Sequence, residues 1–234
     1  DNHMMLELID TAGIRKQIRN APAIEQQSVR QTLGVLPEVD IILLVLDGAS
    51  ELERQDQHLG GVVSESGRAA VVLINKADLV PPNKRKTIEQ RVRSYLPMLS
   101  WANLVWVSAI TGEGLHTVLP TARQAADAWN KTLTLDEIIV LQNLIKKSHL
   151  TKRLPWGKAL QINTQPPKFS IEIRTKATLP KSIQQWIEGV LRRRFNFVGT
   201  PVRVHLEMLR KGEAGTKQWT SGKIAIARRP HTTG

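Results

Sequence analysis

Four consecutive residues, Asn75-Lys76-Ala77-Asp78, place an amide, a cation and a carboxylate directly after an apolar run at residues 69–74. One carboxylate can accept hydrogen bonds from two neighbouring donors. Guanine offers such a pair, a ring N1–H and an exocyclic amine, whereas adenine has a bare lone pair and no amine on that edge. A site built on paired hydrogen bonds rejects the wrong analogue by roughly 10⁴–10⁵-fold. We therefore expect Asp78 to be that carboxylate, Asn75 to contact the opposite edge of the base, and the stem of Lys76 to lie across its plane.

A second segment with residues that could bind a ligand lies near the start of the chain. Residues 6–9 alternate like a strand and run into Asp10-Thr11-Ala12-Gly13. In phosphate-binding α/β folds a carboxylate at a strand end holds Mg²⁺, often through water, so Asp10 is the candidate Mg²⁺ residue. A following glycine lets a backbone N–H approach a terminal phosphate. These four residues are therefore candidate nucleotide-binding residues.

A third segment, residues 104–107, is strand-like and ends at Ser108-Ala109. There a backbone N–H can reach the guanine carbonyl oxygen without a side chain in the way. Each segment could be an ordinary turn when taken alone. Together they stand in the order DxxG, NKxD, SA, each after an expected strand, and ligands of open α/β sheets bind at that edge. The set predicts a guanine-nucleotide site.

The elements that must position these residues alternate between strand and helix. The expected strands are residues 6–9, 40–46, 69–74 and 103–107. The expected helices, each following one of these strands, are residues 25–36, 54–66, 84–96 and 114–131. Apolar strands alternating with helices indicate a parallel sheet covered on both faces. The fold class predicted for residues 1–131 is therefore α/β.

The pattern changes at about residue 132. Thr134 and Glu137 form a capping box that opens a helix. Strands at 159–164 and 169–175, an amphipathic helix beginning at Pro180 and a strand at 202–206 complete the expected small α+β domain, residues 132–209. Residues 210–234 are polar, basic and poor in periodicity, so we expect a disordered tail.

Charge is distributed unevenly over the 234 residues. Residues 1–131 hold 14 Lys/Arg and 15 Asp/Glu, whereas residues 132–234 hold 19 and 6. Such a basic half favours an RNA or ribonucleoprotein partner, although a solubilising surface would have the same composition. Arg192-Arg193-Arg194 are candidate RNA contacts, and they equally suit the negative C-terminal end of the helix that they close.

Composition also limits the function classes. The chain has no cysteine, which excludes disulfides and thiolate sites. No apolar run reaches the length of a membrane span, and no signal-peptide pattern is present, so we expect a cytoplasmic protein. The sequence does not indicate the oligomeric state.

The motifs from residue 6 to 207 resemble the C-terminal part of the bacterial double-GTPase family EngA (Der). Residues 10–16, the Asn75–Asp78 loop and Ser108-Ala109 resemble its second GTPase domain. Residues 165–167, 179–182 and 199–204 resemble its KH-like domain. The resemblance implies a P-loop GTPase-type sheet followed by a KH-like domain, GTP hydrolysis by the full-length protein with Mg²⁺ and K⁺, and assembly of the large ribosomal subunit through rRNA or its precursor particle.

Three departures from the family pattern qualify this expectation. No GxxxxGK[ST] phosphate loop occurs in the 234 residues, so we expect a sheet that is incomplete on its N-terminal side and a chain that is inactive alone. Ala77 stands where the family usually has Trp. The lone GxxG, from Gly212 to Gly215, lies in the tail, so a classical RNA-clamping KH loop is absent.

Ile14 follows Gly13, at the position where Ras-like GTPases place a water-orienting glutamine. A hydrophobic side chain cannot align water, so we expect slow intrinsic hydrolysis and name no catalytic residue. The alternative function is a non-catalytic ribosome- or RNA-binding module on a degenerate GTPase scaffold.

Overall fold

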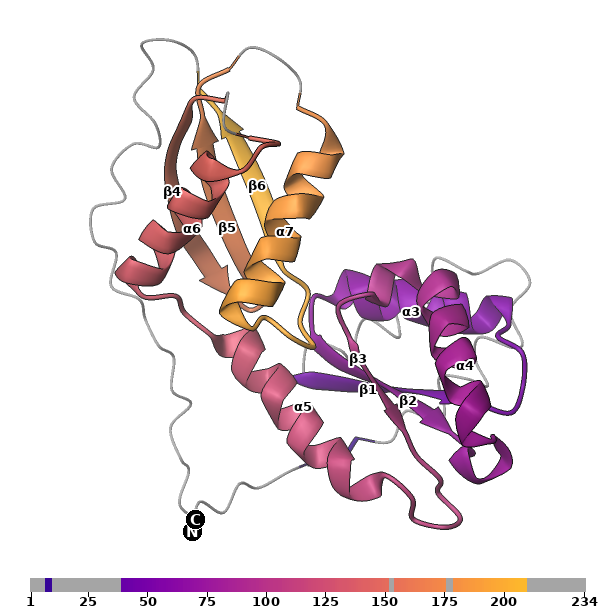
Figure 1. Ribbon diagram of the computed structural model, residues 1–234. Coiled ribbons are helices and arrows are strands. Elements are labelled where there is room, and N and C mark those ends of the chain that lie inside the picture. The colour runs from indigo at the N-terminus through magenta and orange to yellow at the C-terminus, as the bar shows by residue number, and fades with distance from the viewer. Residues whose placement is uncertain (1–6, 10–38, 152–153, 176–178, 210–234) are drawn as a thin grey trace, which may run out of the picture.

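The computed structural model describes residues 7–9, 39–151, 154–175 and 179–209 (Figure 1). In chain order the elements are β1 (Ile41–Asp47), α3 (Arg54–Ser66), β2 (Ala69–Asn75), η2 (Ala77–Leu79), α4 (Pro82–Tyr95), η3 (Pro97–Leu99), β3 (Asn103–Trp106), α5 (Leu115–Asn130), α6 (Leu135–Lys147), β4 (Trp156–Thr164), β5 (Pro167–Ile173), α7 (Lys181–Phe195) and β6 (Arg203–Met208). They build two separate three-stranded sheets.

The first sheet has the order β1-β2-β3, and both strand pairs are parallel. Its register sets Asp47 opposite Asn75, so the ends of β1 and β2 meet at one edge. Helices α3 and α4 lie on one face and α5 lies on the other (Figure 1). We call residues 39–131 the parallel-sheet unit.

Strand β2 is buried on both faces, which explains its continuous apolar sequence. Ala70, Val72 and Ile74 pack with α3 and α4. The alternate residues Ala69, Val71 and Leu73 pack against α5. This central strand carries Asn75 to the sheet edge on a rigid support.

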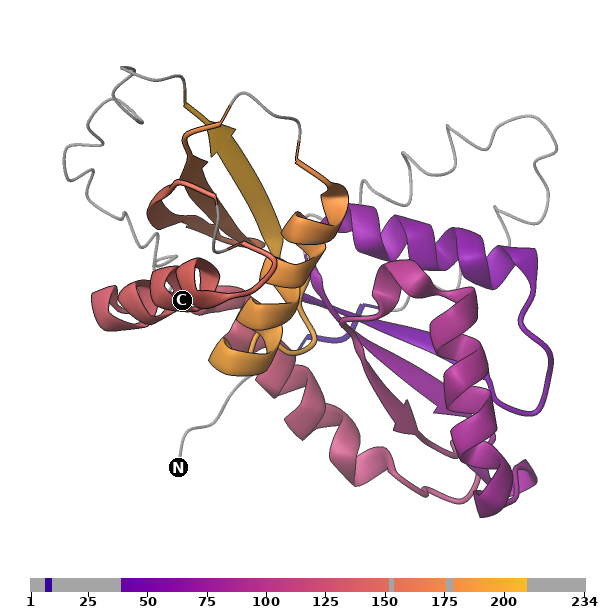
Figure 2. The same ribbon diagram turned by 45° about the horizontal axis from the view of Figure 1, so that its top comes forward.

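The second sheet has the order β4-β5-β6, with β4 antiparallel and β6 parallel to β5. Helices α6 and α7 cover the same face of it (Figure 2). In the core between these helices and the sheet, the rings of Phe169 and Phe197 meet edge to face, with centroids 5.7 Å apart. We call residues 132–209 the mixed-sheet unit, and its αββαβ order is the one expected from the sequence.

The two units are joined through a loop before β6. The Gly199 carbonyl accepts from the Ala70 N–H at 2.9 Å, and the Gly199 N–H donates to the Trp101 carbonyl at 3.1 Å. Gly199 has φ +69°, and a Cβ there would lie 2.5 Å from the Cβ of Ala125. The loop therefore attaches directly to the start of β2, the strand that ends at Asn75.

One side chain beside this loop strengthens the connection, because Lys131 Nζ donates to the Phe195 carbonyl at 3.0 Å, at the end of α7. Within the parallel-sheet unit, the Trp129 indole donates to the Gly67 carbonyl at 2.8 Å and fixes the end of α5 against the end of α3. The units are thus connected by backbone and side-chain hydrogen bonds around the α5–α6 junction.

The expected elements from residue 40 to 206 are confirmed, with ends shifted by a few residues at most sites. The predicted strand at residues 6–9 is wrong for the residues described. Residues 7–9 have no regular structure, and Leu8 is 83% exposed. A strand is stable only when it pairs with a neighbour and buries one face. Four residues of alternating apolar and polar type ensure neither the pairing nor the burial. The expected helix at 25–36 and the tail from 210 lie outside the described residues.

Within the described ranges, no helix combines the length and apolar character needed to cross a bilayer.

Candidate guanine-binding site

Asn75 is the last residue of β2, and the chain turns sharply after it. Lys76 adopts the left-handed conformation with φ +66°. Ala77 is 1% exposed and begins the short helix η2, where its N–H donates to the Val107 carbonyl at 3.0 Å. The turn leaves Asp78 exposed at the sheet edge.

Side-chain hydrogen bonds connect this turn to the loop after β3. Ser108 Oγ donates to Asp78 Oδ1 at 2.5 Å, and the Ala109 N–H donates to Asn75 Oδ1 at 3.1 Å. The structure thus brings together Asn75, Asp78, Ser108 and Ala109, which lie 30 or more residues apart in pairs. We call residues 75–79 and 107–113 the two base loops.

Ser108 orients the Asp78 carboxylate. It is fully buried, and its Oγ also accepts from the Thr111 N–H at 3.1 Å. Because that bond occupies a lone pair, the hydroxyl proton is directed to Asp78. One carboxylate oxygen is therefore held in place, and the exposed carboxylate is presented to a ligand.

The amide of Asn75 is oriented in a similar way. Its Oδ1 accepts from Ala109, so its Nδ2 is left as the donor group. A purine N7 is an acceptor and is complementary to that donor. The Ala109 N–H, expected to reach the guanine oxygen, is shared with Asn75 in this structure.

Lys76 is anchored by Asp47, which lies outside the three sequence motifs. Lys76 Nζ lies 2.6 Å from Asp47 Oδ2. Partial burial raises the pKa of Asp47, but hydrogen bonds from Lys76, the Ala49 N–H and Ser50 more than offset this, so the pKa lies below its ordinary value. Asp47 is ionised at neutral pH and holds the lysine stem at the strand ends.

Gly48 allows β1 to approach the base loop. Its N–H donates to the Asn75 carbonyl at 2.8 Å. A Cβ at this position would lie 2.8 Å from the same carbonyl oxygen and 2.9 Å from the Trp106 ring. The Asp47-Gly48 pair at the end of an apolar strand was the available sequence signal for both residues.

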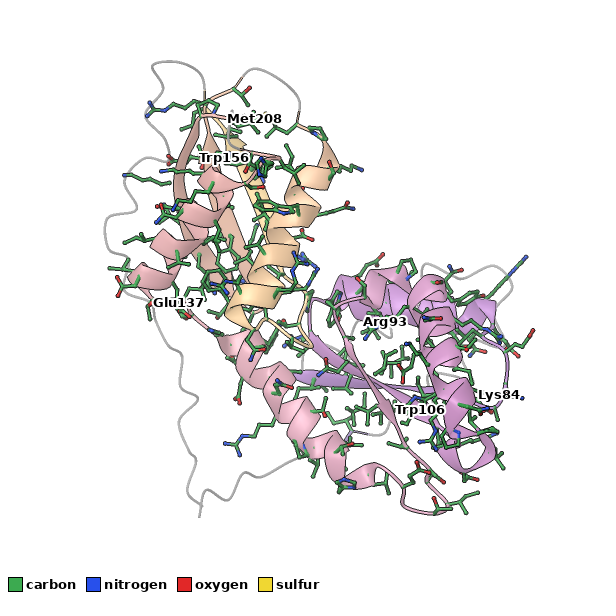
Figure 3. All side chains as sticks on the ribbon, viewed as in Figure 1. Lys84, Arg93, Trp106, Glu137, Trp156 and Met208 are labelled. Carbon is green, nitrogen blue, oxygen red and sulfur yellow. The ribbon has the colours of Figure 1, made fainter. Side chains whose placement is uncertain are left out.

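A third support missed from the sequence comes from α4. Arg85 donates to the Ala77 carbonyl and to the Glu113 carboxylate. Trp106, at the end of β3, lies next to α4 (Figure 3) and donates to Glu89 at 2.8 Å. No local sequence pattern predicts such contacts, because they join side chains that are far apart in the chain.

Apolar side chains flank the polar groups of the base loops. Ile110 is 87% exposed and Leu79 is 63% exposed. Exposed apolar side chains beside an oriented carboxylate can cover the face of a planar base. A cavity of about 420 Å³ lies on another side, between the end of β1 and α4, where Asp47, Lys84 and Arg91 line it.

The remaining predicted nucleotide-binding residues, Asp10, Thr11, Ala12 and Gly13, lie outside the described residues, as does Ile14. Within the described ranges, no three His, Asp or Glu side chains gather in a way that could hold a metal ion.

Arg193 and Arg194 are exposed near the end of α7, whereas Arg192 is half-buried and lies 4.0 Å from Glu188. Burial raises the pKa of Glu188 and lowers that of Arg192. The structure therefore separates the triplet into one packed arginine and two that a polyanion could reach.

Known proteins resemble both units. Residues 132–207 match the family model of the KH-domain-like, C-terminal domain of EngA bacterial GTPase enzymes, and residues 1–76 match that of 50S ribosome-binding GTPases. GTPase Der of Bacillus cytotoxicus is 31% identical over 204 residues, 84% of this chain and 47% of the relative. GTPase Der of Caldanaerobacter subterraneus is 32% identical over 205 residues, 83% and 46%. The expected resemblance to EngA (Der) is confirmed.

The chain spans about half the length of the curated relatives it matches. Among solved structures, Era of Aquifex aeolicus is 16% identical, with a TM-score of 0.38 over 82% of this chain and 73% of that one.

Proposed function

We propose that this chain is part of a GTP-binding and GTP-hydrolysing protein that assists assembly of the large ribosomal subunit. The observation that carries the proposal is the Ser108–Asp78 hydrogen bond, which presents an oriented carboxylate at the carboxyl edge of a parallel sheet. The names of the relatives, GTPase Der, agree with it.

In the proposed complex, Asp78 accepts from guanine N1–H and from the exocyclic amine. Asn75 Nδ2 donates to N7, and the Ala109 N–H, now shared with Asn75 Oδ1, turns toward O6. The stem of Lys76, anchored through Asp47, covers one side of the base. The exposed Ile110 side chain covers the other.

The phosphate end of the nucleotide is assigned by resemblance. Asp10 would hold Mg²⁺ through water, and the Gly13 N–H would approach the terminal phosphate. When bound, Mg²⁺ neutralises charge that develops on the phosphates. K⁺ is implied by the family resemblance, and we assign it no residue. Asp10, Thr11, Ala12 and Gly13 therefore remain the proposed phosphate-side residues of the chain.

The mixed-sheet unit is the proposed ribosome-binding part. Arg193 and Arg194 are exposed on α7 and can contact rRNA phosphates. A family model matched by residues 1–76 is described as a 50S ribosome-binding GTPase, which favours the large subunit or its precursor. Such a partner also implies a cytoplasmic location.

The test uses the full-length protein and fluorescent GDP, with unlabelled nucleotides as competitors. Asp78→Asn should weaken GDP binding by about 100-fold or more, because the amide cannot accept from both guanine donors. The same change should favour XDP, whose C2 carbonyl can accept from the new amide. Asp127→Asn, an exposed change on α5, is the matched control. Equal binding of GDP and ADP by the wild type would overturn the proposal.

A non-catalytic RNA-binding module is the second candidate. It is favoured by one observation, the net positive charge of residues 132–234, which hold 19 Lys/Arg and 6 Asp/Glu. Salt-dependent binding to ribosomal particles by a full-length protein that binds no guanine nucleotide would support this candidate over the first.

A further inference from the structure

Arg85 lies in the first turns of α4, close behind the two base loops. Pro82 begins the helix, where proline is favoured because its fixed φ suits the first helical position, and Arg85 follows in the same turn. The side chain is 23% exposed. It is more buried than its neighbours Lys84 and Lys86, which are both exposed.

The guanidinium group bridges the two base loops. Its Nη2 donates to the Ala77 carbonyl at 3.0 Å, and its Nη1 donates to Glu113 Oε1 at 2.7 Å. Ala77 immediately precedes Asp78. The Glu113 carbonyl accepts from the Ser108 N–H at 2.9 Å, so each end of the bridge is one step from a residue expected to touch the base.

The bridge is supported from behind by an aromatic ring. The Arg85 guanidinium carbon lies 5.3 Å from the Trp106 ring centroid, and the Trp106 indole is itself fixed by Glu89. The Arg85 Nε is buried and finds no hydrogen-bond partner among the described residues. Burying a donor without a partner is costly, so the guanidinium is held here by its other contacts.

We propose that Arg85 is a positioning residue for guanine discrimination, holding the Asp78 loop and the Ser108 loop at one fixed separation. This inference rests on the proposed function. Arginine suits the role because its planar fork donates in two directions at once, whereas a lysine ammonium acts as a point charge.

The separation of the loops matters because of the paired hydrogen bonds. Asp78 must face both the N1–H and the amine of guanine while Ser108 holds one of its oxygens. Hydrogen bonds weaken steeply when they bend or lengthen. If the loops move apart, the hydrogen bond from the exocyclic amine to Asp78 is lost before the bond from N1–H. The site then binds guanine no better than hypoxanthine, which lacks the amine.

IDP is the probe that isolates this effect, since hypoxanthine keeps N1–H and lacks the exocyclic amine. In the full-length protein, Arg85→Ala should raise the Kd for GDP by about tenfold, the loss expected for one charged hydrogen bond. It should raise the Kd for IDP by only about twofold, so the preference for GDP over IDP falls. Arg85→Lys should recover part of the preference.

Two controls separate positioning from general stability. Lys86→Ala removes an exposed cation from the same helix and should change neither Kd. Circular-dichroism melting should show that the variants are folded. Should Arg85→Ala not fold, Glu113→Ala removes one end of the bridge and should lower the GDP-over-IDP preference in its place.

The outcomes are distinguishable. A wild type with no guanine preference would defeat the proposed function itself. A wild type that prefers GDP, combined with an Arg85→Ala variant whose GDP-over-IDP preference is unchanged, would overturn the role of Arg85 alone. A lowered melting temperature with that preference intact would indicate a purely structural arginine and would also overturn it.

Discussion

Asp47 illustrates how a single residue outside the recognised motifs can support the site. Its carboxylate holds Lys76 at 2.6 Å, and its pKa is lowered by that contact and by the Ala49 and Ser50 hydrogen bonds, against the effect of partial burial. A lowered pKa means that the folded state binds the proton less well than the unfolded chain. The stability that Asp47 contributes is therefore complete above its ordinary pKa of 3.8 and is lost as the pH falls through the lower folded value.

The corresponding test replaces Asp47 with Asn. The variant should be less stable than the wild type at pH 6. The difference should shrink at pH 3, which lies below the ordinary pKa of 3.8, because the unfolded chain then takes up the proton that the folded state binds less well. Urea denaturation at the two pH values measures it. Asp40→Asn, an exposed change just before β1, should show no comparable difference. An Asp47→Asn deficit that is equal at both pH values would refute the ionic role.

Ile14 carries the second residue-scale prediction. Replacing it with Gln should raise the single-turnover rate of GTP hydrolysis in the full-length protein by roughly tenfold or more, because glutamine can orient the attacking water. Rapid mixing with labelled GTP measures the rate. GDP affinity serves as the control and should not change. An unaltered rate would mean that another group already orients the water.

The candidate residues found from the sequence share one property. Asn75, Asp78 and Ser108 each lie directly after a run that already predicts a strand, so their positions follow from the fold class. Asp47 and Arg85 act through partners 28 or 29 residues away. Such pairs depend on how the elements pack. The end of an apolar strand marks the position of Asp47 but does not identify its partner, and no local pattern marks Arg85.

At the scale of elements, neighbouring residues in the sequence predicted the start of the helix at Thr134 correctly, but they did not predict correctly whether residues 6–9 form a strand. The Thr134–Glu137 capping box is present as expected, with Glu137 donating its N–H to Thr134 Oγ1 at 3.2 Å. Alternation at residues 6–9 was misleading, because pairing in a sheet depends on distant partners. A helix start is decided within one turn, and a strand is decided by its neighbours.

The contact of the Gly199 loop with β2 yields an element-scale prediction. Gly199→Ala should destabilise the protein by roughly 2–5 kcal/mol, combining the left-handed backbone penalty with a clash against Ala125. Urea denaturation measures the loss. Because the loop bonds to Ala70 at the start of β2, the variant should also bind GDP less tightly.

Gly112→Ala, in the second base loop, is the matched control for the stability loss. Gly112 has φ +80°, so alanine meets the same backbone penalty, but nothing lies within 4 Å of the new Cβ. Its loss should be limited to about 1–2 kcal/mol. Equal losses for the two variants would show that the contact between the units adds nothing.

At the scale of the whole molecule, charge and recognition lie in different units. The base loops belong to the parallel-sheet unit, whose part of the chain is close to neutral, whereas 19 of the 33 Lys/Arg residues lie at 132–234. The Gly199 loop and Lys131 join the two units by hydrogen bonds. The mixed-sheet unit is thereby hydrogen-bonded to the strand that carries Asn75.

Together with the proposed function, this division predicts how salt should act on the proposed binding of the full-length protein to ribosomal particles. The double change Arg193→Ala/Arg194→Ala should weaken binding to ribosomal particles and should make the slope of log K against log[salt] shallower by about one to two, since each phosphate contact releases about one counterion. Co-sedimentation with the particles at a series of KCl concentrations measures both effects. Lys84→Ala/Lys86→Ala removes two exposed charges from the parallel-sheet unit and should leave the slope unchanged. If both double variants alter the slope equally, the phosphate contacts are spread over the surface, and the exposed end of α7 has no special part in them.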